Sequence, residues 1–221
     1  MPLNAMDAGG LRGSRLAGFR HKGMRLEQMG KIYYMMGKSS SGKDTLYREV
    51  MKRFPGLGKV VSYTTRPLRE GERSGVQYHF VDEAELNRLE AEEKVVELRA
   101  YHTVHGVWKY FTVDDGQIDL YHKSYLMIGT LESYEKMRTY YGAEQMIPIY
   151  IEVDDGVRLE RALKREQSQT QPKYKEMCRR FLADEEDFCE ENLRRLGIDK
   201  RYENTDMETC LKKITEEIQN G

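Results

Sequence analysis

The sequence predicts an α/β fold in which helices cover both faces of a parallel sheet. Short apolar stretches of β-like composition alternate along the chain with longer stretches of helical periodicity. The length of 221 residues suits one domain, or one core with an inserted lobe. Hydrophobic residues make up 39% and charged residues 33%, which allows a core beneath a heavily charged surface.

The predicted strands are short runs rich in β-branched and aromatic residues. In order they are 32–36, 60–64, 95–101, 107–112, 125–128, 147–153 and a short last one at 201–203. Stretches with apolar residues at helical spacing separate many of these strands. The predicted helices are 44–54, 131–141, 156–166, 174–196 and 207–218. Pro148 is expected at the start of its strand, where proline is tolerated.

Composition excludes several classes of protein. The longest apolar run, Ile32 to Met36, has five residues, whereas a membrane helix needs about 20. The net charge of −1 argues against a protein built mainly to bind nucleic acid. Cys178, Cys189 and Cys210 are too few and too widely spaced for a zinc knuckle or a disulfide framework. We therefore expect a cytoplasmic protein with small-molecule partners and without nucleic-acid or membrane partners.

Residues 1–30 differ in composition from the rest of the chain. They contain six glycines and five Lys and Arg against Asp7 and Glu27, a local charge of +3, and they show no apolar period. We expect residues 1–30 to be a disordered or dispensable leader, or an extension upstream of a true start at Met29. Residues 31–221 are expected to form the folded domain.

A phosphate-binding motif lies between the first strand and the first helix. Gly37, Gly42 and Lys43 have the spacing G-x-x-x-x-G-K. Glycines let backbone N–H groups surround phosphate oxygens, the helix N-terminus adds partial positive charge, and the lysine reaches the terminal phosphates. The ATP-binding candidates are Gly37, Lys38, Ser39, Ser40, Ser41, Gly42, Lys43, Asp44 and Thr45. The alternative is a serine-rich turn capped by Asp44.

Asp44 departs from this motif, which has Ser or Thr after the lysine to bind Mg²⁺. A carboxylate is a harder and charged oxygen donor that Mg²⁺ also accepts. We therefore expect Asp44 to hold Mg²⁺, directly or through a water, while Lys43 offsets its repulsion of phosphate.

A second motif, T-T-R-x-x-R followed by a tyrosine, lies between Val61 and Val81. Together with the phosphate-binding loop upstream, it makes the chain resemble the guanylate kinases from about Lys31 to the C-terminus. The resemblance implies a P-loop NTPase-type parallel sheet, a small β-rich acceptor-binding lobe and a helical lid. It implies a core at 31–65 and 113–221, a lobe at about 66–112 and a lid at about 158–180.

The resemblance also implies an acceptor site for GMP. Its residues would be Ser62, Arg66, Arg69, Tyr78, Glu97, Tyr110 and Thr112. The arginines and Tyr78 would hold the phosphate, since guanidinium forks match phosphate and a phenol adds a neutral donor. Glu97 would read guanine, because a carboxylate can accept from both N1–H and the exocyclic amine.

The lid corresponds to a basic stretch with eight Lys and Arg against three Glu at 158–180. Its arginines would neutralise the transferring phosphoryl group, and they are Arg161, Arg165 and either Arg179 or Arg180. Asn204 corresponds to a position near the donor's adenine. The stretch 126–130 lacks the aspartates that the family uses near the base and the metal, which leaves the acceptor open.

The sequence therefore predicts Mg²⁺-dependent transfer of phosphate from ATP to GMP. One alternative is a ribose 1,5-bisphosphate phosphokinase, which the stretch Gly42-Lys43-Asp44 and the missing aspartates resemble. The segment 64–80 favours a guanylate kinase instead. A non-catalytic guanylate-kinase-like binding module is the other alternative, and the retention of Lys43, Arg161 and Arg165 argues against it.

Overall fold

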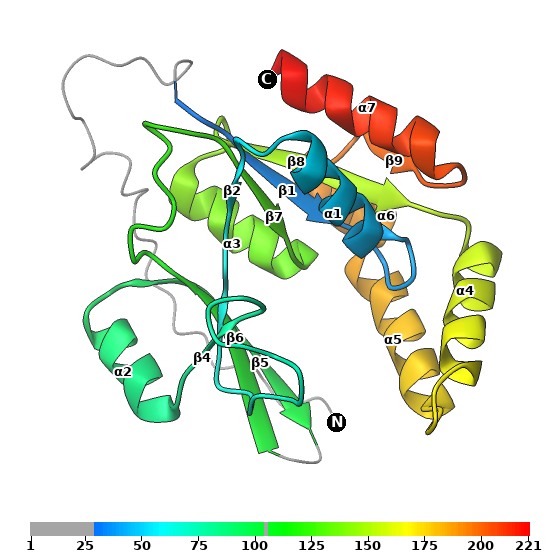
Figure 1. Cartoon of the computed structure of the whole chain (residues 1–221), viewed down its shortest axis with the longest axis horizontal. Helices are drawn as coiled ribbons and strands as arrows, with labels where there is room; N and C mark the ends of the chain where they lie inside the picture. The colour runs from blue at the N-terminus through cyan, green and yellow to red at the C-terminus, as the bar shows by residue number, and fades with distance from the viewer. Residues whose placement is uncertain (1–28, 104–105) are drawn as a thin grey trace.

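The structure is a computed structural model that describes residues 29–103 and 106–221, in which two sheets are each packed against helices (Figure 1). Sheet A has five strands in the order β2–β7–β1–β8–β9, and all of its pairings are parallel. Its strands are β1 (Ile32–Met36), β2 (Gly58–Lys59), β7 (Tyr125–Ile128), β8 (Met146–Glu152) and β9 (Arg201–Glu203). The predicted parallel α/β fold is thereby confirmed.

Sheet B is smaller and mixed, with the strand order β4–β3–β6–β5. Its strands are β3 (Tyr63–Thr64), β4 (His79–Phe80), β5 (Val95–Thr103) and β6 (Gly106–Val113). In Figure 1 this sheet and α2 (Glu83–Ala91) form a lobe below sheet A, and α4 with α5 forms a second projection beside it. The two projections place side chains from distant parts of the sequence around the phosphate-binding loop.

The other helices cover sheet A and form the second projection. They are α1 (Lys43–Arg53), α3 (Leu131–Tyr141), α4 (Asp155–Gln167), α5 (Tyr174–Asp187), α6 (Glu190–Arg195) and α7 (Met207–Asn220). Several begin where a short polar side chain caps the first turn: Asp82 accepts from Glu85 N, Thr130 from Ser133 N, and Asp206 from Thr209 N. Within the described ranges, no helix is long and apolar enough to span a bilayer.

The alternation of side chains along β1 builds a core layer on each face of sheet A. Ile32, Tyr34 and Met36 pack towards α3 and α6, whereas Tyr33 and Met35 pack towards α1 and α7. The lobe has its own small core, formed by Leu86 and Leu89 of α2 and by Phe111 and Val113 of β6. The loop before α1 is therefore held on a strand that is buried on both faces.

Two predicted elements are corrected by the structure. Of the strand predicted at 60–64, only Tyr63–Thr64 is a strand, β3 of sheet B; residues 60–62 connect it to β2 of sheet A, which lies before the predicted range, because the chain crosses here from the core into the lobe. The helix predicted at 174–196 is two helices, α5 and α6. Cys189 adopts an extended conformation between them (ψ 155°), and Phe188 stacks on Tyr150 in the core. Helix α2 and strand β4 were not predicted.

The predicted leader at 1–30 lies almost wholly outside the described residues. The described part begins with Met29, which is buried in the core, and Gly30. Gly30 has no room for a side chain, because a Cβ there would lie 2.2 Å from the carbonyl oxygen of Lys123.

Candidate active site

The predicted phosphate-binding loop joins β1 to α1 and has an unusual backbone. Gly42 has a φ of 87° directly before α1, and Ser40 has a φ of 64°, which costs a residue with a side chain roughly 1 kcal/mol. The hydroxyl groups of Ser40 and Ser41 are buried and make no hydrogen bond to a described residue. A loop with strained backbone and unused polar atoms suits a ligand that supplies oxygen atoms.

Asn204, which follows the edge strand β9, contacts this loop and is contacted in turn by Arg161 of α4. The Asn204 amide donates to the Ser41 carbonyl oxygen over 2.7 Å, and Arg161 Nη2 donates to the Asn204 carbonyl oxygen over 3.1 Å. A Cβ on Gly42 would lie 2.4 Å from Asn204 Nδ2, so this position requires glycine. The structure thus places Asn204 and Arg161 against the loop. Contact between Asn204 and adenine stays a prediction.

Two carboxylates of α5 contact the loop, and sequence reasoning did not identify them. Ser39 N donates to Asp184 Oδ2 over 2.7 Å, and Lys38 Nζ pairs with Glu185 over 2.6 Å. A backbone N–H that meets a carboxylate is a group that can also meet a phosphate oxygen. The phosphates of a bound nucleotide would therefore compete with Asp184 for Ser39.

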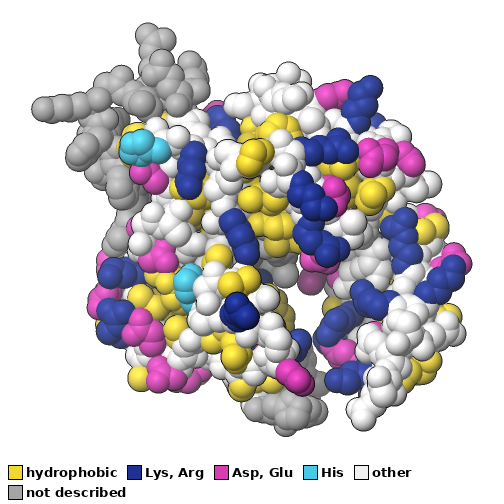
Figure 2. Space-filling view, in the orientation of Figure 1, with side chains coloured by type: hydrophobic (Ala, Val, Ile, Leu, Met, Phe, Trp, Pro, Cys, Tyr) yellow, Lys and Arg dark blue, Asp and Glu magenta, His cyan; other side chains and the backbone are white. Residues whose placement is uncertain are grey.

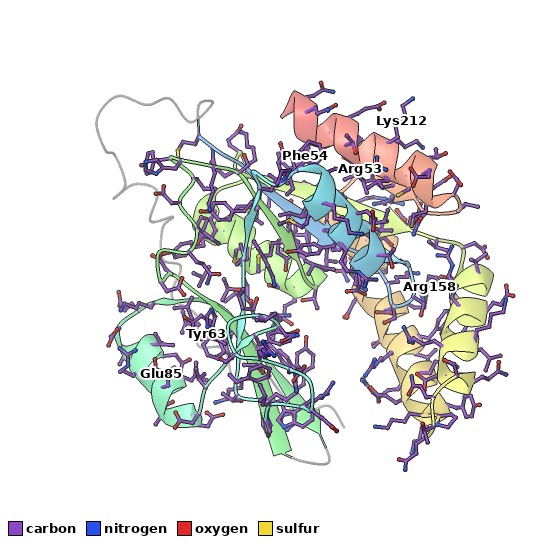
Figure 3. The ribbon with its side chains drawn as sticks, viewed as in Figure 1. Arg53, Phe54, Tyr63, Glu85, Arg158 and Lys212 are labelled. Carbon is purple, nitrogen blue, oxygen red and sulfur yellow. The ribbon has the colours of Figure 1, made fainter. Side chains whose placement is uncertain are left out.

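Arg158 is the second feature that sequence reasoning overlooked. Figure 3 shows it near the loop, where the two helices α4 and α5 lie together. Its side chain is 1% exposed and lies 3.3 Å from both Asp155 and Glu185 and 4.0 Å from Asp184. Its guanidinium also lies over the ring of Phe181. Its Nε and Nη2 are buried and make no hydrogen bond to a described residue, although Nη2 is ion-paired with Asp184.

A cavity of about 520 Å³, the lid cavity, is lined mainly by α4 and α5, together with Ser39 of the loop. Its cationic lining comes from three elements: Arg69 from the lobe, Arg158 and Arg165 from α4, and Lys173 and Arg180 at the start of and within α5. Figure 2 shows Lys and Arg side chains gathered on the face where the lobe and the α4–α5 projection approach each other. This concentration of cations suits the phosphates of a nucleotide.

The geometry separates Arg179 from Arg180, which sequence spacing could not do. Both pair with Glu176, and the hydrogen bond from Arg179, aided by Arg180, lowers the pKa of Glu176 to about 2. Only Arg180 lines the lid cavity. Arg180 is therefore the better candidate for a contact with phosphate.

A second cavity of about 520 Å³, the lobe cavity, lies between the loop and sheet B. It is lined by Lys43 and Asp44 of α1 and by three of the predicted acceptor-site residues, Ser62, Tyr78 and Tyr110. Arg99, which was not predicted, lines it as well. The rings of Tyr78 and Tyr110 meet edge to face at 5.5 Å, and burial raises the pKa of Tyr78. Tyr78 is thus a neutral hydrogen-bond donor in this cavity.

Arg66 and Glu97, two further predicted site residues, are both buried in ion pairs. Arg66 is 3% exposed and is held bidentately by Glu72, with Nη1 and Nη2 at 3.0 and 2.8 Å from its carboxylate oxygens. Glu97 is held in the same way by Arg99 and also accepts a hydrogen bond from Thr112. Neither Glu97 nor Thr112 lines the lobe cavity, whereas Arg99 does.

Lys43 lines the lobe cavity and interacts electrostatically with Arg158 and Arg165, which line the lid cavity. Burial lowers the pKa of Lys43, and the carboxylates of Asp44 and Asp184 oppose this effect. Asp44 is exposed in the first turn of α1 and lines the lobe cavity beside Lys43. The arrangement can hold two ligands whose phosphates meet beside one lysine.

Comparisons with known proteins agree with this geometry. The sequence model described as guanylate kinase matches residues 29–220. A guanylate kinase of Thermobifida fusca is 44% identical over 71 residues, which are 32% of this chain and 36% of that protein. A guanylate kinase of Schizosaccharomyces pombe is 46% identical over 68 residues, 30% of this chain and 34% of that protein. The matched segments therefore span only about a third of these relatives.

The whole fold has a counterpart among solved structures. A crystal structure of guanylate kinase from Anaplasma phagocytophilum is similar with a TM-score of 0.58 and 21% sequence identity. The match covers 87% of this chain and 86% of that one. With the family's sequence pattern matched over almost the whole described region, this chain belongs to the guanylate kinase family.

Proposed function

We propose that this protein transfers the γ-phosphoryl group of ATP to GMP. The observation that carries the proposal is the position of the phosphate-binding loop between two cavities. The lid cavity has the cations that a triphosphate needs, and the lobe cavity has the polar aromatic lining that suits a nucleoside monophosphate. Lys43 lies where the transferred group would pass from one to the other.

Catalysis in this arrangement comes from positioning and charge stabilisation. The loop and Lys43 would orient the donor phosphates, and Arg165 and Arg180 would reach the transferred group from the lid side. Arg69 reaches the lid cavity from the lobe, and the proposal assigns it to the acceptor phosphate where the two substrates meet. No side chain needs to act as a strong base, because phosphoryl transfer of this kind depends mainly on neutralising charge.

The residues present fit a magnesium ion bound together with the substrate. Mg²⁺ is commonly held by one or two carboxylates plus substrate phosphates rather than by a cage of protein ligands. Asp44 provides one exposed carboxylate beside Lys43. Among residues 29–103 and 106–221, no group of three His, Cys, Asp or Glu forms a preformed metal site. When bound, the ion would neutralise charge on the donor phosphates, and Asp44 would hold it there.

The proposal is tested by measuring ADP formation from ATP with GMP, dGMP, AMP, UMP and ribose 1,5-bisphosphate as acceptors. We expect GMP and dGMP to support turnover that requires Mg²⁺. The variant Arg69→Ala should raise the KM for GMP and leave the KM for ATP nearly unchanged. Preference for ribose 1,5-bisphosphate, or no transfer to any acceptor, would contradict the proposal.

A further inference from the structure

Arg99 lines the lobe cavity, in which the carboxylate of Glu97 was expected to read the base. It lies on β5, two residues from Glu97, so the two side chains share one face of sheet B. The Arg99 side chain is 11% exposed and lines the cavity, whereas the Glu97 side chain is 0% exposed. A ligand that enters from the loop therefore meets the guanidinium of Arg99 first.

Glu97 fixes the orientation of this guanidinium. Arg99 Nε donates to Glu97 Oε2 over 2.9 Å, and Arg99 Nη2 donates to Glu97 Oε1 over 3.0 Å. Thr112 donates to the same Oε1 over 2.9 Å, so most of the acceptor capacity of the carboxylate is used. The guanidinium has five N–H groups, and this pair engages one edge of it. The outer N–H groups of Nη1 and Nη2 form a second fork.

The surroundings of that second fork are polar and have space for a ligand. Arg99 Nη1 lies 3.4 Å from Thr130 Oγ1, and the hydroxyl of the half-exposed Tyr101 is a further hydrogen-bonding neighbour of the guanidinium. The buried Tyr34 hydroxyl also lines the cavity and makes no hydrogen bond to a described residue. A Cβ on Gly129 would lie 2.0 Å from Tyr34 Oη, so an aspartate at position 129 could not coexist with Tyr34 here. Around Arg99 the cavity therefore offers guanidinium donors and two hydroxyl groups, and the neighbouring carboxylate of Glu97 is buried in its pair with Arg99.

We propose that Arg99 selects the acceptor base by donating from its outer fork to O6 and N7 of a 6-oxopurine. An arginine fork matches these two adjacent acceptors of guanine, a pairing common in nucleic-acid recognition. Adenine presents an amino group in place of O6, which would set donor against donor. The 2-amino group of guanine is not read in this arrangement. The inference rests on the proposed function and extends its substrate class to both GMP and IMP.

Steady-state transfer from ATP to GMP, IMP, AMP and 7-deaza-GMP tests the proposal on the unmodified protein. We expect kcat/KM for IMP to be within about tenfold of that for GMP, because both bases present O6 and N7. AMP should be at least about 100-fold poorer, since a donor facing a buried donor is strongly rejected. Loss of N7 in 7-deaza-GMP should lower kcat/KM roughly 5-fold or more, the smaller end of what one bidentate pair contributes.

The variant Arg99→Lys tests whether Arg99 contacts the base, because a purely structural role would not change the ratios of kcat/KM between these substrates. Lysine keeps the positive charge beside Glu97 but has no fork. It should therefore abolish the difference between GMP and 7-deaza-GMP and reduce the discrimination against AMP. Within the described part of the chain, the exposed Arg88 of α2 pairs with Glu85 and Glu92 of its own helix region, so Arg88→Lys is the matched control and should change none of these ratios.

The outcomes separate this inference from the function on which it rests. Transfer to GMP with IMP more than 100-fold poorer would mean that the 2-amino group is read, and it would overturn the role of Arg99. Equal use of GMP and 7-deaza-GMP by the unmodified protein would overturn it as well. Absence of transfer to every purine monophosphate would instead refute the proposed function, and the inference with it.

Discussion

Replacing Arg158 by methionine should destabilise the fold, because Arg158 is the cation that three carboxylates around the loop share. It is 1% exposed, and its partners differ in exposure: 50% for Asp155, 36% for Glu185 and 15% for Asp184. Methionine would keep an apolar contact with Phe181 and remove the charge. Asp184, the least exposed carboxylate, would lose the most electrostatic stabilisation.

The size of the effect follows from these exposures. At 4 Å and an effective dielectric constant of about 20, two opposite unit charges attract each other by about 4 kcal/mol. We use this value for the pair of Arg158 with the largely buried Asp184. The two more exposed pairs contribute about 0–1 kcal/mol each because solvent screens them. Methionine avoids the desolvation cost of a buried guanidinium, which offsets part of the loss. We expect a net loss of about 2–4 kcal/mol, or roughly 5–15 °C in Tm for a domain of this size.

Thermal and urea unfolding of Arg158→Met, Arg179→Met and Arg180→Met measure this loss against matched arginines. Arg179 and Arg180 are 64% and 57% exposed and pair with Glu176 on one helix, so their removal should cost no more than about 0.5 kcal/mol. Arg180→Met should lower kcat at nearly unchanged stability, while Arg179→Met should change neither. Unchanged stability of Arg158→Met, within about 0.5 kcal/mol, would refute the reasoning and show that the desolvation cost cancels the ion pairs.

Three further predictions concern the loop. Lys43→Met should lower kcat about 100-fold or more with little effect on Tm. In the unmodified protein, burial lowers the pKa of Lys43, and bound phosphates should raise it again; the alkaline limb of kcat/KM for ATP should therefore lie at lower pH than the alkaline limb of kcat. Superimposable limbs would contradict this. Asp184→Asn should lower the KM for ATP roughly 5-fold, since a neutral amide competes less with phosphate for the Ser39 amide than a carboxylate does, and the exposed Glu186→Gln is its control. Asp44→Asn should raise the Mg²⁺ concentration for half-maximal turnover, and an unchanged Mg²⁺ titration would reduce Asp44 to a residue of the first helical turn.

The core of the fold could be predicted because its signals are local. β1 is a continuous apolar run buried on both faces, and the glycine-rich turn after it leads directly into α1. The segments that the prediction missed lack such signals. β4 has only two residues, and the chain between 58 and 64 leaves one sheet and enters another without a change in its apolar pattern. Long-range contacts decide which sheet each strand joins, and the periodicity of the sequence does not predict these contacts.

The candidate site shows the same limit at the level of single side chains. The spacing of the loop identified Lys43 and Asp44, because the backbone geometry of such a loop is specified within a few residues. Other site residues meet their partners only in the folded chain: Asp184 of α5 contacts Ser39 of the loop, and Arg158 of α4 contacts Asp184 of α5. Arg99 pairs with Glu97 because both lie on the same face of β5. Each is an ordinary charged residue in its own sequence context.

The pair of Glu97 and Arg99 shows why the family pattern alone cannot identify the group that faces the acceptor. The pattern marks the carboxylate, but the residue two positions later on the same face covers it and presents the opposite charge to the cavity. A side chain has little room at position 129, because a Cβ there would lie 2.0 Å from Tyr34 Oη. Under the proposed recognition, the fork of Arg99 and the absence of a carboxylate at 126–130 act together, because both favour a base that presents acceptors to the cavity.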